Sequence, residues 1–272
     1  MVATLAHVPA AEAIPELLER HGGRIYALGL RLCGDAADAQ DLVQETFLSA
    51  FRHWEGFEGR AKASTWLYTI AARACRRMQR RRSGQPAHIA SLEELLPGEE
   101  AAVPTLEGLG DDPLSEQLRR ETQERVAHAL AGVPPDFRIP LVLKDVVGLS
   151  LAEIGRALGV KEATVKTRVH RARLALRRAL AEGLPSRPAA PPDHERAVCL
   201  DLLRAKQEAM DRGVELAVPD ADLCTRCRAL FATLDLARDT CVRIARGELP
   251  EPLRLLVLRA IAREARAGVG GG

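Results

Sequence analysis

The residues best suited to chemistry are four cysteines in the C-terminal third of the 272-residue chain. Cys224 and Cys227 form a Cys-x2-Cys motif, with Cys199 upstream and Cys241 downstream. A Cys-x2-Cys pair lets two thiolates share one ion, and zinc takes thiolate and imidazole ligands in a tetrahedron. The pattern favours a zinc site. It leaves open a dithiol switch, a site for another metal such as copper, or cysteines that only pack in a metal-free helical domain.

Residues 65–82 are predicted to form a helix from their apolar pattern. The C-terminal end of this helix is strongly basic. Within ten positions it carries Arg73, Arg76, Arg77, Arg80, Arg81 and Arg82. Such a cluster suits the phosphates of a nucleic acid. The alternative is a solvated helix end.

Residues 150–178 predict a helix-turn-helix. Ser150 and Glu153 form a capping box that starts a helix, and Gly159 suits the left-handed conformation that ends one. In the second helix the apolar positions Val165 and Val169 face inward. The opposite face carries Lys161, Thr164, Lys166, Thr167, Arg168, Arg171 and Arg173. A short helix, a glycine turn and a basic second helix fit the major groove of DNA, whereas the alternative is a helical hairpin with a solvated basic face.

The elements that must position these residues are helices. Apolar residues make up 47% of the chain but aromatic residues only 3%, and abundant Ala, Leu, Arg and Glu favour helices over sheets. Residues 83–113 hold four prolines and seven acids without Lys or Arg, and residues 184–193 hold four prolines. Both predict linkers. We therefore expect an all-α chain of three small domains, at residues 14–82, 114–183 and 194–266.

Several classes of protein are disfavoured. No run approaches the ~18 apolar residues of a membrane span, and the N-terminus lacks the pattern of a signal peptide. We expect a cytoplasmic protein with no membrane partner, whose cysteines are reduced or bind metal. We find no paired nucleophile and base, phosphate loop or nucleotide fingerprint, so we do not expect an enzyme. The net charge is only +2 because the negative charges of the acidic linker offset the positive charges of the basic helices.

Two separated blocks resemble the extracytoplasmic-function (ECF) sigma factors of bacterial RNA polymerase. Residues 38–47 and 57–71 are similar to region 2 of that family, and residues 149–173 are similar to region 4. The resemblance covers about residues 14–183. It implies a protein that binds core RNA polymerase and directs promoter-specific transcription initiation. The alternative is a polymerase-independent helix-turn-helix regulator with a metal- or redox-sensing C-terminal domain.

The resemblance also implies roles for individual residues. Region 2 would bind the clamp helices of the β′ subunit through Asp38, Asp41, Gln44 and Glu45. It would recognise and open the −10 element with Arg60, Lys62, Ser64, Trp66, Arg73, Arg76, Arg77 and Arg80. Region 4 would contact the β flap and read the −35 element with Lys166, Thr167, His170 and Arg171, flanked by Lys161, Thr164, Arg168 and Arg173. Arg73 stands where the family commonly has Asn, and Ala63 and Ser64 where an aromatic residue often occurs. The acidic linker would thread into a basic channel of the polymerase, whereas the alternative is a solvated spacer.

The C-terminal segment resembles the zinc-binding anti-sigma fold, whose usual pattern is Cys, then His-x3-Cys-x2-Cys. Cys199, Cys224 and Cys227 match three ligands. Asp220 stands in place of the histidine, so the fourth ligand would be Asp220, His194 or Cys241. Such a tethered domain could fold over the sigma domains and respond to metal loss or oxidation; the opposite role, a requirement for activity, is also open. We expect Cys33 and Cys75 to be packing residues.

Overall fold

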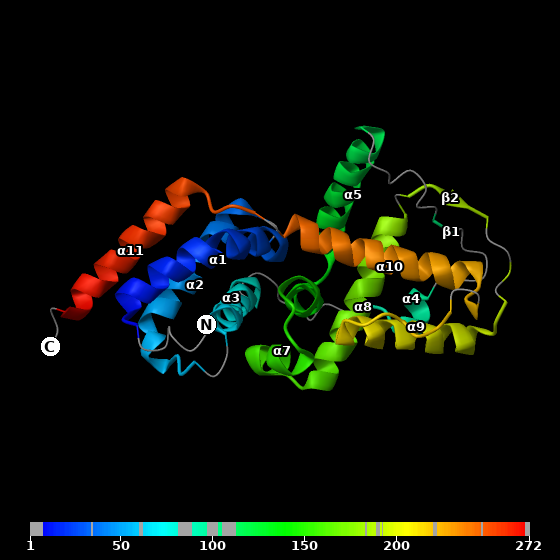
Figure 1. Cartoon of the computed structure of the whole chain (residues 1–272), viewed down its shortest axis with the longest axis horizontal. Coiled ribbons are helices and arrows are strands. Elements are labelled where there is room, and N and C mark those ends of the chain that lie inside the picture. The colour runs from blue at the N-terminus through cyan, green and yellow to red at the C-terminus, as the bar shows by residue number, and fades with distance from the viewer. Residues whose placement is uncertain are drawn as a thin grey trace. The chain divides into compact units, whose positions relative to one another are not determined.

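The computed structural model confirms the helical class (Figure 1). It describes residues 8–33, 35–59, 62–80, 89–96, 103–104, 113–182, 184–188, 191, 193–219, 222–245 and 247–269. The α-helices are α1 (Ala10–Cys33), α2 (Ala36–Arg52), α3 (Ala63–Arg80), α4 (Leu92–Leu95), α5 (Pro113–Gly132), α6 (Pro135–Leu141), α7 (Leu151–Leu158), α8 (Glu162–Ala181), α9 (Arg196–Arg212), α10 (Thr225–Ile244) and α11 (Glu251–Val269). A 3-10 turn, η2 (Trp54–Gly56), and a π-helical turn, η3 (Val142–Val147), complete the helical elements.

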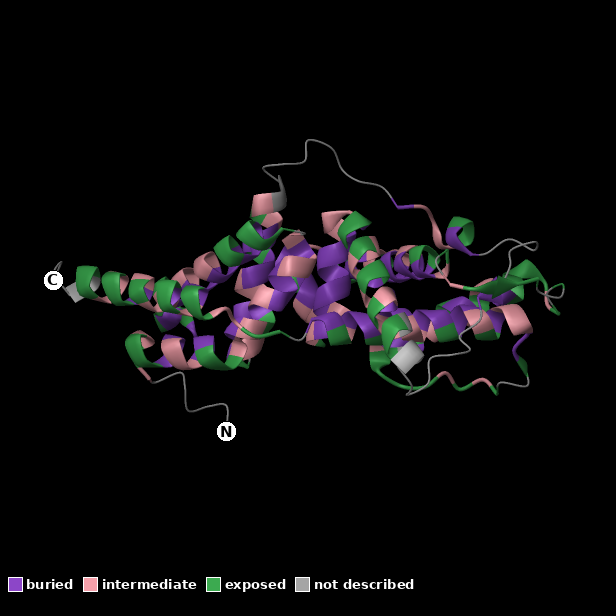
Figure 2. Ribbon diagram, turned by 90° about the horizontal axis from the view of Figure 1, so that it is seen from above, coloured by how far each residue is buried: buried purple, intermediate pink, exposed green. Residues whose placement is uncertain are grey.

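The described residues form two compact units. The first contains the described residues up to 80, residues 153–160, and those from 244 onward; the second contains those of 89–152 and 161–243. Within each unit, buried positions lie on the sides of helices that face their neighbours (Figure 2). No described helix is both long and apolar enough to cross a membrane.

The first unit is built on α1, α2 and α3. Asp35 caps α2 by accepting a hydrogen bond from the Ala37 N–H at 3.0 Å. The core is formed by apolar side chains with little or no exposed surface, including Ile14, Leu18, Leu42, Phe47 and Leu67. Burial of these apolar side chains supplies most of the stabilisation of these helices.

Helix α11 packs against α1 and α2 in the same unit. Its connection approaches α1 closely, because a Cβ placed on Gly23 would lie 2.5 Å from the carbonyl oxygen of Gly247. Two ion pairs accompany this approach: Arg254 with Glu19 at 2.6 Å, and Arg52 with Glu264. The predicted domain at residues 194–266 is therefore divided, since α11 packs in the first unit whereas α9 and α10 pack in the second. The segment 247–250, with a glycine and a proline, separates these two parts.

The second unit packs α8 against α5 and α6, with α9 and α10 in the same unit. Its core includes Leu130, Ile139, Leu143, Val165 and Leu174.

The helix–glycine–helix order predicted for residues 150–178 is confirmed, because α7 ends at Leu158, Gly159 has a φ of +67°, and α8 begins at Glu162.

The described residues of the acidic segment 83–113 include a short helix and a short strand. Ser91 and Glu94 form a capping box that starts α4. Further along, β1 (Val103–Pro104) pairs antiparallel with β2 (Ser186–Arg187), and these are the strands among the described residues. The apolar side chains of Ile89, Leu95 and Val103 are buried and anchor the segment. The two predicted linkers therefore contact each other in the second unit.

Candidate nucleic-acid interface and cysteine cluster

The predicted DNA-reading face of α8 is only partly open to solvent. Lys161, Thr164 and Thr167 are exposed, and Lys166, Arg168 and Arg171 are half-buried. His170 and Arg173 are buried, with 5% and 3% of their surface exposed. The prediction that these two residues contact DNA therefore requires that whatever covers them moves.

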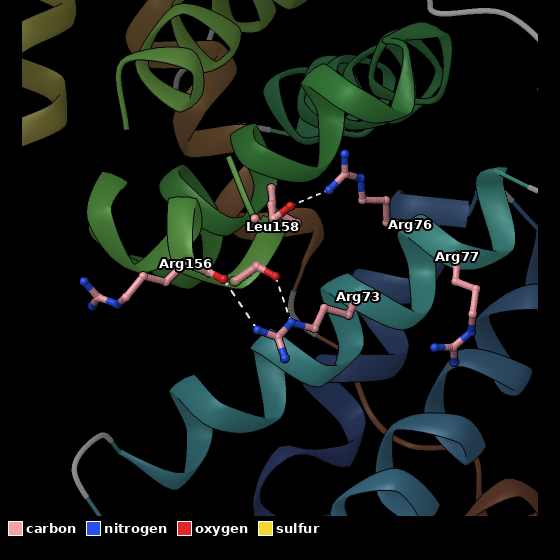
Figure 3. A pocket seen from close by; sticks show the side chains of 7 residues that line it. Arg73, Arg76, Arg77, Arg156 and Leu158 are labelled. Carbon is pink, nitrogen blue, oxygen red and sulfur yellow. Dashed lines mark hydrogen bonds between the residues drawn. The ribbon is translucent and has the colours of Figure 1, made fainter. Parts of the chain in front are cut away.

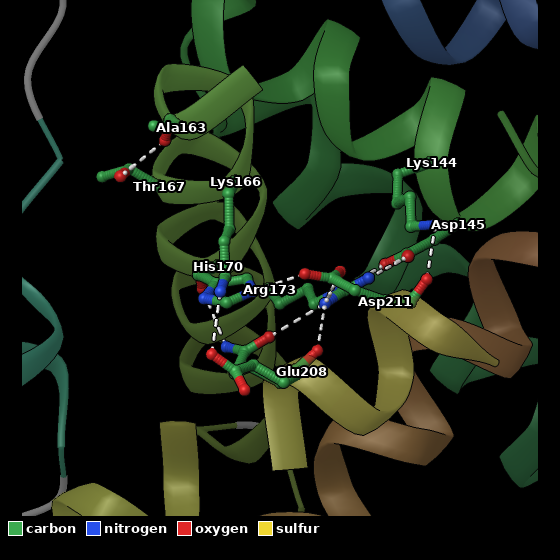
Figure 4. A network of polar contacts seen from close by, with 10 residues as sticks. Lys144, Asp145, Ala163, Lys166, Thr167, His170, Arg173, Glu208 and Asp211 are labelled. Atoms are coloured by element: carbon green, nitrogen blue, oxygen red, sulfur yellow. Dashed lines mark hydrogen bonds and ion pairs between the residues drawn. The ribbon is translucent and has the colours of Figure 1, made fainter. Parts of the chain in front are cut away.

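The cover is α9, which places carboxylates on the basic residues of α8 (Figure 4). Glu208 pairs with Lys166 at 2.8 Å, and Asp211 Oδ2 lies 2.7 Å from His170 Nε2. Asp211 Oδ1 also lies 2.8 Å from Arg173 Nη1. Three side chains predicted to meet DNA are thus paired with acids of the C-terminal extension. Because Glu208 and Asp211 are three residues apart on one helix, they share a face.

Arg173 is the centre of a buried polar network. It donates two hydrogen bonds to the Asp145 carboxylate, at 2.8 and 2.5 Å, and one to the Gln207 side chain at 3.1 Å. The fully buried Gln207 in turn donates to the His170 carbonyl oxygen at 3.0 Å. Burial by itself would lower the pKa of Arg173, but the charges of Asp145 and Asp211 raise it above its usual value. Arg173 is therefore a charged residue held between η3 and α9.

Asp211 is stabilised in its ionised form. Its burial would raise its pKa, but the hydrogen bond from His170 and the charge of Arg173 lower that pKa below its usual value. Lys144 also donates to the Asp211 carbonyl oxygen at 2.8 Å. The C-terminal end of α9 is therefore held in place through both the side chain and the backbone carbonyl group of Asp211.

The acidic segment adds further contacts to α8 and α9. Arg171 donates to the carbonyl oxygen of Ile89 at 3.3 Å. On α9, Arg204 pairs with Glu93 at 3.1 Å, and Arg196 donates to the Glu93 carbonyl oxygen at 2.5 Å. The acidic segment thus contacts the predicted recognition helix and the helix that covers it.

In the first unit, two of the predicted DNA-contacting arginines are held by α7 (Figure 3). Arg73 Nε donates to the Ala157 carbonyl oxygen at 2.9 Å, and Arg76 Nη1 donates to that of Leu158. The last carbonyl groups of a helix lack partners within the helix and carry its negative dipole end, so guanidinium groups stabilise them. Arg77 points away from α7 and pairs with Glu45 at 2.6 Å.

The remaining region 2 predictions have mixed environments. Lys62 and Asp41 are exposed, whereas Asp38 is buried at the start of α2. Ser64, Trp66 and Gln44 are half-buried. Trp66 packs against Trp54 and Phe57, with ring centroids 5.7 and 5.3 Å away. Arg60 and the side chain of Arg80 lie outside the described residues.

Three of the cysteines that the sequence singles out form a compact cluster. The sulfur atoms of Cys199, Cys224 and Cys227 all lie within 4.8 Å of one another, and all three residues are buried. Cys199 lies in the first turn of α9, Cys227 in the first turn of α10, and Cys224 just before α10. Three buried thiols at this separation fit a thiophilic ion such as zinc.

The two cysteines of the Cys-x2-Cys motif differ in acidity. Burial would raise the pKa of Cys224, but backbone N–H groups of Cys227, Arg226 and Asp193 lower it; the Cys227 N–H donates to the Cys224 sulfur at 3.4 Å. Burial and the neighbouring thiols raise the pKa of Cys227 far above its usual value. Cys224 is therefore the thiol that ionises first, at a helix start that favours a thiolate.

The three candidates for a fourth metal ligand differ in where they lie relative to the cluster. Cys241 was a wrong candidate, because α10 is continuous from Thr225 to Ile244 and its rise of 1.5 Å per residue places Cys241 about 21 Å along the axis from Cys227. His194 Nε2 lies 3.2 Å from the Asp222 carbonyl oxygen, and His194 is not among the clustered residues. Asp220 lies outside the described residues.

The acids that cover α8 were missed by sequence reasoning. Glu208 and Asp211 share the face of a predicted helix, and this spacing was the available signal. Asp145 and Gln207 had no comparable signal, because their partner Arg173 is distant in sequence.

Comparison with known proteins identifies the class of this chain. The family model for Sigma-70 region 2 matches residues 17–85, and that for Sigma-70 region 4 matches residues 123–176. The helical fold and the helix–glycine–helix of α7 and α8 agree with these assignments, so the chain is a protein of the sigma-70 class.

Its relatives define the family more narrowly. The chain is 38% identical over 169 residues to the ECF RNA polymerase sigma factor SigE of Mycolicibacterium smegmatis, covering 61% of each chain. It is 32% identical to SigW of Bacillus subtilis, covering 62% of this chain and 89% of SigW. Among solved structures, CnrH in complex with the cytosolic domain of CnrY matches with 25% identity and a TM-score of 0.45, covering 67% of this chain and 98% of that chain. The chain belongs to the ECF RNA polymerase sigma factors, which direct transcription initiation.

Proposed function

We propose that this sigma factor binds core RNA polymerase through region 2 and directs it, in the cytoplasm, to promoters whose −35 element is read by α8. Asp41 and Gln44 offer accessible polar groups on α2 for the polymerase. Glu45 is paired with Arg77 and would have to exchange that partner. Asp38 is buried and serves the start of α2 rather than the polymerase surface.

We further propose that α9 keeps the protein in a closed form in which the −35 readout is blocked. The observation that carries this proposal is the pairing of Glu208 and Asp211 with Lys166, His170 and Arg173. Carboxylates on these cations compete with DNA phosphates, which bind by the same charge-assisted contacts. Opening would return Lys166 and His170 to solvent, whereas Arg173 would retain Asp145 as its partner.

The cysteine cluster is the proposed trigger for opening. Zinc bound by Cys199, Cys224 and Cys227 would tie the first turn of α9 to the start of α10, and Asp220, His194 or a water molecule would complete the coordination. Because the same helix carries Glu208 and Asp211, the metal would restrain the segment that covers α8. Metal loss or thiol oxidation would loosen α9 and favour the open form.

Run-off transcription with core RNA polymerase and genomic promoter fragments tests this function. The full-length chain is expected to bind core polymerase and to initiate at a defined set of fragments. Glu208→Gln is expected to increase the transcript yield, whereas Asp201→Asn, an exposed change on the same helix, is expected to leave it unchanged. A chain that binds DNA but neither binds core polymerase nor supports initiation would instead be a polymerase-independent regulator.

A further inference from the structure

A second pair of thiols lies in the first unit, within region 2. Cys33 is the last residue of α1, and Cys75 lies in α3, which packs against α1. Their sulfur atoms are 3.8 Å apart. Cys75 is fully buried, whereas Cys33 is partly exposed. The sequence predicted only packing roles for both, because 42 residues separate them in the chain.

This arrangement is suited to formation of a disulfide. An S–S bond is about 2.05 Å long, so the sulfurs must approach by roughly 1.8 Å. Rotation of side chains at the end of a helix supplies such a movement more readily than a shift of packed backbone, and Cys33 occupies that position. The partly exposed thiol is open to an oxidant, and the buried thiol is held beside it as the resolving group.

We propose that Cys33 and Cys75 are a redox-sensitive pair that a hydroperoxide converts into a disulfide. The Cys33 thiolate attacks the peroxide O–O bond, which gives a sulfenic acid and, with the thiol proton, releases water for hydrogen peroxide or an alcohol for an organic hydroperoxide. The Cys75 thiol then attacks the sulfenic sulfur, the S–S bond forms, and a water molecule leaves. Each thiol loses one hydrogen atom, and the peroxide is reduced by two electrons.

The bond would act on the segment of α3 that carries the predicted DNA contacts. Cys75 lies between Arg73 and Arg76, the two arginines that hold the end of α7. Joining Cys75 to α1 fixes this part of α3 and restricts the unfolded chain across the intervening segment. Oxidation is thus expected to stabilise region 2 and to favour retention of the α3–α7 contacts. This pair is chemically separate from the cluster of Cys199, Cys224 and Cys227.

Peptide mapping of the full-length protein after treatment with hydrogen peroxide tests the proposal. Free thiols are alkylated without reduction, and the protein is then cleaved with trypsin. The expected product is a disulfide between the peptides of residues 32–52 and 74–76, which a thiol reductant reverses. The oxidised protein is also expected to have a higher Tm than the reduced protein.

Cys33→Ser is the matched control, because this side chain is partly exposed and the substitution preserves size. The variant is expected to fold, as judged by circular dichroism, and to show neither the linked peptide nor the rise in Tm. Absence of the linked peptide in the wild type while Cys33 proceeds to sulfinic acid would overturn the proposal. A rise in Tm that persists in Cys33→Ser would equally overturn the stabilising role of the bond.

Discussion

His170 Nε2 lies 2.7 Å from Asp211 Oδ2, so a side chain predicted to read DNA is joined to a carboxylate of the C-terminal extension. Both side chains are nearly inaccessible, with 6% and 8% of their surface exposed. A buried polar group that loses its partner is destabilised unless water or another group replaces that partner. The contact therefore couples access to the predicted DNA-reading face of α8 with the position of α9.

Asp211→Asn is expected to increase affinity for promoter DNA more than Glu208→Gln does. Glu208 forms a solvent-exposed pair worth about 0.2–1 kcal/mol, whereas removing one partner of a buried pair costs about 3 kcal/mol or more. The measurement is fluorescence anisotropy with a labelled promoter fragment at fixed salt. Equal effects of the two substitutions would contradict the view that the buried network, rather than surface charge, holds α9 closed.

The stability of the closed form is expected to depend on pH through Asp211. Its folded-state pKa is lowered, so its contribution is complete above the usual carboxyl pKa of about 3.9 and is lost as the pH falls through the lower folded value. Urea unfolding of the wild type and Asp211→Asn should show a stability difference that is present at about pH 5 and shrinks as the pH falls below about 4. A difference that persists unchanged through strong acid would argue against an ionised, paired Asp211.

Metal analysis of the purified chain is expected to find one zinc ion per molecule. Cys199→Ser should lose the metal and raise transcription, because the first turn of α9 is released. Cys241→Ser is the matched control, since Cys241 is a buried cysteine on α10 far from the cluster. Loss of zinc from Cys241→Ser to the same extent as from Cys199→Ser would contradict the proposed ligand set.

Gly23→Ala is expected to displace α11 from region 2. The added Cβ would lie 2.5 Å from the Gly247 carbonyl oxygen, and such overpacking typically costs about 1–3 kcal/mol. Thermal unfolding and limited proteolysis should show a lower Tm and faster cleavage near residue 247. Gly56→Ala serves as the control, because nothing lies within 4 Å of its added Cβ. If Gly56→Ala destabilised the protein equally, the close approach at Gly23 would not be the cause.

The sequence predicts well those features that depend on local chemistry. The helical class follows from the composition, the turn at Gly159 follows from a glycine placed after a capping box, and the clustering of Cys224 with Cys227 follows from their spacing. Cys241 was misplaced as a ligand because the sequence does not reveal that α10 continues unbroken past it. Asp211 and His170 are 41 residues apart in the sequence, and their pairing depends on the packing of α9 against α8. No local sequence pattern encodes this packing.

The sequence also does not predict that α11 packs in the first unit while α9 and α10 pack in the second. Residues 247–250 mark a break between helices, but their composition does not tell which unit the following helix joins. That choice is made by the close approach at Gly23 and by the pairs of Arg254 with Glu19 and Arg52 with Glu264. These contacts depend on α1 and α2, which lie more than two hundred residues earlier.

We propose that α9 blocks promoter recognition by neutralising the basic face of α8. The most direct test is promoter-dependent transcription by full-length Glu208→Lys, which places a positive charge against Lys166, compared with Asp201→Lys, which adds the same charge at an exposed position of α9. If α9 blocks α8 in this way, Glu208→Lys raises transcription above both the wild type and Asp201→Lys. Equal transcription from the two variants, or a loss confined to Glu208→Lys, would contradict it.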